Sequence, residues 1–187
     1  MIEHEIPHGR RLELARRLFA ELSETAPVPE TIVAAADAVR IAPSRLYARA
    51  AGLDIAPDPA LDRALEGSPG LRAAYARMLE KTSLYRLPVL AAAHSGSENS
   101  RTGEGCEIRI EQHPAYPDQA YVIIKVTEAR ESRPTTLIIC DRDNHCEDYA
   151  LPEMWDNTAQ MVVELESDVC RRVWRFLDDS GMRAYLR

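Results

Sequence analysis

The sequence predicts an α+β protein: a small N-terminal helical bundle followed by a C-terminal antiparallel β-sandwich or barrel of six to seven short strands. Apolar residues recur at helical spacing up to about residue 95 and alternate with polar residues after about residue 105. The charge divides at the same place. Lys and Arg balance Asp and Glu at 12 each in residues 1–95, whereas residues 96–187 hold 11 against 18. We therefore expect a helical domain over 1–95, a linker over 96–105 and a β-sandwich domain over 106–187.

Helix-start signals mark the front part of the chain. Asp58-Pro59 and Ser68-Pro69 each place a capping oxygen ahead of a proline that suits the first helical position. Gly52 suits the left-handed residue that follows a helix. The predicted helices cover residues 10–23, 30–40, 44–51, 60–67 and 70–82, with a last one at 87–93 that Pro88 breaks.

Part of this helical stretch resembles the DNA-binding domain of tetracycline-repressor-type regulators. Leu18, Phe19, Ala20 and Glu21 match the opening helix of that family, and Ala36, Ile41, Leu46 and Tyr47 match core positions of its helix-turn-helix. The resemblance implies that Ser44, Arg45 and Arg49 enter the DNA major groove. A DNA-binding regulator that uses residues 30–51 is therefore an alternative function. It ranks second because the helical part has no positive excess to attract nucleic acid.

Residues 58–93 have the texture of the cytoplasmic helices of bacterial anti-sigma factors. A short helix with an acidic cap precedes a longer one that is rich in Ala and Arg. This resemblance implies a regulator that binds part of the transcription machinery. The zinc-binding version of the family is excluded, because no cysteine precedes Cys106.

Strand periodicity marks the back part of the chain. Cys106, Ile108 and Ile110 alternate with charged residues, as expected for a strand with one buried face. The predicted strands cover residues 106–112, 120–126, 135–140, 145–151, 159–165 and 182–186. We expect a short helix over 168–177, capped by Asp168 and ended by Gly181.

The four cysteines, Cys106, Cys140, Cys146 and Cys170, are irregularly spaced and follow no export signal. We expect reduced thiols packed as small hydrophobes. Cys140 and Cys146 flank a predicted hairpin turn, so a cross-strand thiol pair or a redox-sensitive disulfide is the alternative. With His145 they also form a candidate metal site, which ranks low because paired Cys-x-x-Cys units are missing.

No sequence motif indicates catalysis. Glycine-rich phosphate loops and recognisable nucleophile motifs are absent, so we expect no enzyme and no cofactor. No run of about 18 apolar residues and no signal peptide occurs, which predicts a cytoplasmic protein without a membrane partner. The main hypothesis is a non-enzymatic regulatory or adaptor protein that binds protein partners in transcriptional or signalling control.

The candidate partner-binding residues fall in two places. Trp155 and Met154 lie in a predicted turn, where Trp155 is either folded back over the end of the sandwich or exposed. Exposed Trp and Met are typical of binding hot spots. Arg10, Arg11, Arg16 and Arg17 lie on the first predicted helix.

Overall fold

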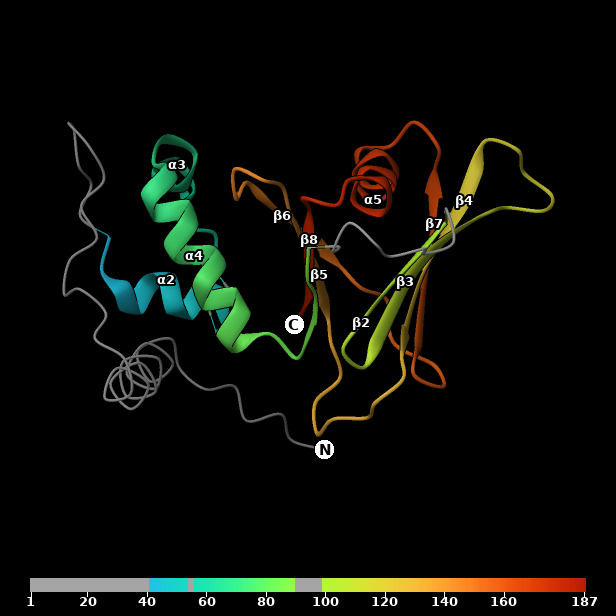
Figure 1. Cartoon of the computed structure of the whole chain (residues 1–187), viewed down its shortest axis with the longest axis horizontal. Helices are drawn as coiled ribbons and strands as arrows, with labels where there is room; N and C mark the ends of the chain where they lie inside the picture. Colours follow the sequence, from blue (N-terminus) through green and yellow to red (C-terminus); the bar gives the residue numbers. More distant parts are fainter. Residues whose placement is uncertain (1–40, 54–55, 90–98) are drawn as a thin grey trace. The chain divides into compact units, whose positions relative to one another are not determined.

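A computed structural model of the chain describes residues 41–53, 56–89 and 99–187. These residues form four helices and eight strands in two antiparallel sheets, so the protein is α+β (Figure 1). The chain separates into two compact units, Met1–Thr82 and Ser83–Arg187. The helices predicted over 10–23 and 30–40 lie outside the described residues, as do Arg10, Arg11, Arg16 and Arg17.

The described part of the first unit is helical. It contains α2 (Pro43–Ala50), α3 (Pro59–Gly67) and α4 (Pro69–Thr82), and both shorter helices pack against α4. The Asp58 carboxylate accepts a hydrogen bond from the Leu61 amide at 3.1 Å, which confirms the predicted cap of α3. The Ser68 hydroxyl oxygen accepts one from the Leu71 amide at 3.2 Å, which confirms the cap of α4. Gly52 takes the predicted left-handed conformation after α2, with φ of 69°.

The second unit is built from two four-stranded sheets. In the first sheet the strand order is β1 (Tyr85–Leu87), β8 (Arg183–Leu186), β5 (Thr136–Cys140) and β6 (Cys146–Ala150). In the second sheet it is β2 (Ser100–Gly103), β3 (Cys106–Gln112), β4 (Gln119–Val126) and β7 (Thr158–Glu164). Strands β2, β3 and β4 follow one another as a meander, β5 and β6 form a hairpin, and β7 returns to pair with β4. Helix α5 (Asp168–Asp178) then leads to β8, which lies between β1 and β5.

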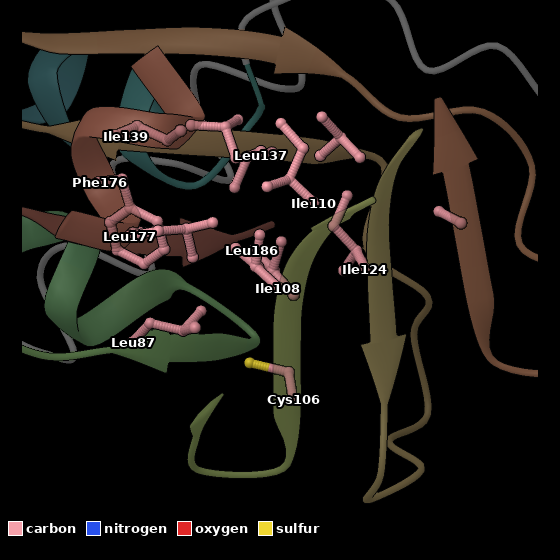
Figure 2. Close-up of a cluster of buried hydrophobic side chains, with 14 of the residues drawn as sticks. Leu87, Cys106, Ile108, Ile110, Ile124, Leu137, Ile139, Phe176, Leu177 and Leu186 are labelled. Carbon is pink, nitrogen blue, oxygen red and sulfur yellow. The ribbon is translucent and has the colours of Figure 1, made fainter. Parts of the chain in front are cut away.

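Both sheets and α5 share one hydrophobic core. Figure 2 shows Ile108 and Ile110 of β3, Leu137 and Ile139 of β5, and Phe176 of α5 in the same cluster. The alternations predicted for β3, β7 and β8 are confirmed, because the positions predicted to face inward belong to the core or pack against it. The strand residues between them lie on the other faces of the sheets.

The structure places the boundary between the two units earlier than predicted. The division at Thr82 and Ser83 replaces the predicted linker at 96–105. Residues 85–87 form β1, whose residues Tyr85 and Leu87 join the core. Leu87, the first residue of the helix predicted over 87–93, is therefore in a strand, and residues 90–93 lie outside the described residues. Three residues are too few to show a period, so this strand depends on its pairing with β8.

Residues 100–103 of the predicted linker form β2, which pairs with β3. Their sequence is polar, and the buried residue of the strand is Arg101, only 2% exposed. Its guanidinium donates hydrogen bonds to the carbonyls of Phe176 at 2.7 Å and Met182 at 2.8 Å. A buried cation with hydrogen-bonded partners therefore occupies a position where strand patterns usually show an apolar residue.

The predicted cap of α5 was wrong by one residue. The Ser167 hydroxyl oxygen accepts the hydrogen bond from the Cys170 amide at 3.2 Å, and Asp168 is the first helical residue. Both residue types cap helices well, so composition alone did not separate them.

Candidate functional site

Trp155 lies at a tight hairpin turn that opens β7. Its backbone exchanges two hydrogen bonds of 2.9 Å with Thr158, and the two residues between them, Asp156 and Asn157, both have positive φ, 47° and 58°. Positive φ at both central positions is the conformation of a type I′ turn, whose twist matches that of the flanking strands. The Trp155 side chain is 86% exposed. The turn therefore presents a large aromatic ring to solvent on an ordered backbone.

Met154, the other predicted contact residue of this turn, is only 5% exposed and belongs to the core cluster. It therefore anchors the turn and does not form part of its surface. The Arg133 guanidinium adds a second tie by donating a hydrogen bond to the Met154 carbonyl at 3.1 Å. The Met154 side chain is therefore fixed inside the protein, whereas the side chain of the next residue, Trp155, lies outside.

Strand register places Trp155 at one end of the outer face of the second sheet. Paired residues of antiparallel strands share a face, so Trp155 lies on the side of Thr158 and its β4 partner Lys125. The rows that follow along the strands are Arg109, Ile123 and Gln160, then Glu111, Tyr121 and Val162. Val162 is 57% exposed. Ile123 is only 6% exposed, so the other residues form the accessible surface. We call this surface, formed by Trp155, Thr158, Lys125, Arg109, Gln160, Glu111, Tyr121 and Val162, the open face.

A second aromatic group lies beyond the other end of this face, in the turn between β3 and β4. The His113 ring lies 4.8 Å from that of Tyr116 and 4.7 Å from that of Tyr121, centroid to centroid. Its Nδ1 accepts hydrogen bonds from the amides of Ala115 and Tyr116, both at 3.1 Å, which fixes the turn. Tyr116 is 57% exposed. The open face thus has exposed aromatic rings near both ends and Val162 between them.

The residues predicted to contact DNA lie on α2, where both arginines pair with carboxylates. Arg45 of α2 forms an ion pair of 2.5 Å with Asp58, and Arg49 forms one of 3.7 Å with Asp62 of α3. Ser44 lies in the first turn of the same helix and is partly exposed. The two guanidinium groups join α2 to the start of α3, so their charge is balanced within the unit. This arrangement favours a structural role for both arginines.

The prediction of reduced cysteines was wrong for two of the four, for which the alternative, a cross-strand disulfide, holds. Cys140 and Cys146 are register partners on β5 and β6, with Cα atoms 4.1 Å apart, and they are joined by a disulfide. Cys106 and Cys170 are free and buried, as predicted for cysteines packed as small hydrophobes. Burial raises the pKa of the Cys106 thiol to about 12, so it stays protonated at neutral pH.

The disulfide also removes the thiolates that the metal hypothesis requires, because metals bind deprotonated cysteine. His145 faces Asp141 instead, with Nδ1 and Oδ2 3.6 Å apart. Within the described ranges, no group of three or more His, Cys, Asp or Glu side chains is placed to hold a metal ion.

A buried arginine of α5 fixes the disulfide hairpin. The Arg172 guanidinium donates hydrogen bonds to the carbonyls of Ile139 at 3.3 Å and His145 at 2.7 Å, the residues that precede the two cysteines. It also lies 3.5 Å from the Glu147 carboxylate. The Asp141 carboxylate accepts hydrogen bonds from the amides of Asp143 and His145, which closes the turn from inside. The turn itself can be recognised in the sequence, because adjacent Asp and Asn residues are typical of turns. The contribution of Arg172 cannot, because it depends on the packing of α5.

Comparison of the chain with protein-family models, with curated proteins and with solved structures finds no match. None of the helices in the described segments combines the length and apolar character that crossing a membrane requires.

Proposed function

We propose that this protein is a non-enzymatic regulatory or adaptor protein that binds a protein partner through the open face, with Trp155 as the main contact. The observation that carries the proposal is the 86% exposure of Trp155 on a turn whose backbone is fixed by reciprocal hydrogen bonds. A rigid aromatic side chain loses little conformational entropy when it is buried by a partner.

The chemistry around Trp155 indicates which partner surface fits it. Glu153 and Asp156, which precede and follow Trp155 in the chain, are both exposed, and Arg133 donates a hydrogen bond to the Met154 carbonyl. A partner pocket that is apolar inside and bordered by Lys or Arg would complement this arrangement. Val162, Tyr121 and Tyr116 would extend the contact along the sheet.

The proposal places the protein in the cytoplasm, in transcriptional or signalling control. It also includes an N-terminal helical bundle as a second binding surface, where Arg10, Arg11, Arg16 and Arg17 would contact another partner. The absence of catalytic motifs in the sequence supports a function in binding, and the paired state of Arg45 and Arg49 favours a protein partner over DNA.

The test compares the two tryptophans of the chain. The full-length protein, Trp155→Ala and Trp174→Ala would each be used to retain proteins from a native lysate of the source organism, with circular dichroism as a check of folding. Trp174, on α5, is 39% exposed and is the matched control. We expect Trp155→Ala to lose a protein that the other two retain, with at least a tenfold weaker Kd in a titration of the purified pair.

If all three proteins retain the same set, or none retains any, the proposed function is wrong. In a Trp174→Phe background, fluorescence reports Trp155 alone. Binding of the purified partner should shift its emission to shorter wavelength as the ring leaves water.

A further inference from the structure

We propose that Cys140 and Cys146 form a reversible thiol–disulfide site, which a dithiol reductant opens by attack on Cys146 and which recloses while the sheet unit stays folded. This site is separate from the open face. Two observations support it: Cys140 and Cys146 differ in solvent exposure, and hydrogen bonds other than the disulfide hold the hairpin that joins them.

The two cysteines differ in access. Cys140 is 0% exposed and lies on β5, an interior strand of its sheet. Cys146 is partly exposed and begins β6, the edge strand. Thiol–disulfide exchange requires a thiolate to reach a sulfur, so an incoming reductant meets Cys146 first.

Opening the disulfide leaves the hairpin held by other bonds. Arg172 still joins the carbonyls of Ile139 and His145, and the Asp141 carboxylate still accepts from two amides of the turn. These contacts keep the residues before each cysteine in place, so the two thiols stay close enough to reclose. Strand β6 supplies no buried side chain to the core cluster, and only Tyr149 packs against it in part. Changes at this edge therefore leave the core intact.

The exchange balances as two thiol–disulfide steps. A thiolate of the dithiol attacks the sulfur of Cys146, the Cys140–Cys146 bond breaks, and Cys140 leaves as a thiolate that takes a proton from water. The second thiol of the reductant then loses its proton and attacks the reductant sulfur of the mixed disulfide. This step releases the thiolate of Cys146, which is then protonated. Two electrons pass to the protein, and the reductant becomes a disulfide. The reverse exchange, with an oxidised dithiol, recloses the site.

The first experiment treats native full-length protein with dithiothreitol, alkylates it with iodoacetamide and maps the modified cysteines by mass spectrometry. We expect alkylation at the partly exposed Cys146 but not at the buried Cys140, Cys106 or Cys170, with an unchanged circular dichroism spectrum. Oxidised dithiothreitol should then restore the disulfide in unalkylated protein. Reduction that requires denaturant, or that exposes all four cysteines together, would show that the bond is only structural.

The second experiment identifies the attacked sulfur. Reduced glutathione, a monothiol, should be trapped as a mixed disulfide on Cys146 at least tenfold more often than on Cys140. Equal trapping at both residues, or more at Cys140, contradicts the proposed route.

The third experiment tests the contribution of Arg172. Arg172→Leu should slow reclosure several-fold, whereas Arg142→Leu, which removes an exposed ion pair with Asp179, should not. Equal reclosure rates would remove Arg172 from the proposal. If Arg172→Leu fails to fold, the two wild-type experiments still decide whether the site is reversible.

Discussion

At the scale of single residues, Arg101 makes contacts within the second unit that the polar sequence around it does not indicate. Its guanidinium donates to carbonyls of α5 and of the segment before β8, and it lies 4.3 Å from the centre of the Phe176 ring. Burial lowers the pKa of Arg101 to about 10, which leaves it charged at neutral pH. One side chain of β2 thus joins the end of α5 to the second sheet.

We expect Arg101→Met to lower the free energy of unfolding by about 3 kcal/mol, because it leaves several buried carbonyls without donors. Urea unfolding followed by circular dichroism measures the change. Arg86→Met is the control, since Arg86 forms an exposed ion pair of 3.4 Å with Glu104 and should contribute about 0–1 kcal/mol. Equal effects of the two substitutions would contradict the role assigned to Arg101.

At the scale of elements, Asp58 has two contacts that join neighbouring helices. It caps α3 and forms the ion pair with Arg45 of α2. Burial opposes ionisation of its carboxyl group, but the hydrogen bonds from Arg45 and from the Leu61 and Ala60 amides outweigh this effect and lower its pKa. Because the pKa is lower in the folded state, Asp58 stabilises the protein above its ordinary pKa of about 3.9. That stability is lost as the pH falls through the folded-state value.

We therefore expect Asp58→Asn, which can still cap the helix, to lower the unfolding free energy at pH 7 by less than about 1 kcal/mol, because the ion pair is partly exposed to solvent. The difference should vanish near pH 2, where the carboxyl group is protonated in both states. Asp58→Ala should cost about 1 kcal/mol more, since the cap is lost at every pH. Thermal unfolding at both pH values measures these changes, and a pH-independent effect of Asp58→Asn would refute the ion-pair contribution.

At the scale of the whole molecule, the position of the boundary decides which fragments can fold. The first sheet takes β1 from residues before the predicted linker, and β8 lies between β1 and β5. A cut after the predicted linker removes Tyr85 and Leu87 from the core as well as Arg101 from the end of α5. The unit is complete only when the cut precedes Ser83.

We expect the fragment 83–187 to unfold cooperatively in urea and the fragment 106–187 to lack a cooperative transition. The physical reason is the loss of two strands, part of the core and the buried hydrogen bonds of Arg101. Both fragments can be compared by circular dichroism and by amide hydrogen exchange. A cooperative transition in the 106–187 fragment would support the predicted boundary at residues 96–105 instead.

The sequence alone determined those features that local patterns control. These are the α+β class, the caps at Asp58 and Ser68, the left-handed Gly52, and the alternating positions of β3, β7 and β8. Each depends on a period or on a contact within a few residues, which composition and spacing reveal.

Only the tertiary structure decided the features that depend on partners distant in the chain. Strands β1 and β2 are too short or too polar to show a period, and their pairing with β8 and β3 defines them. The disulfide between Cys140 and Cys146 depends on the register of β5 and β6, and the exposure of Trp155 depends on Met154 entering the core instead. Long-range packing determines which side of each chain segment is buried. A single sequence reveals the buried side only where its apolar residues recur with a regular period.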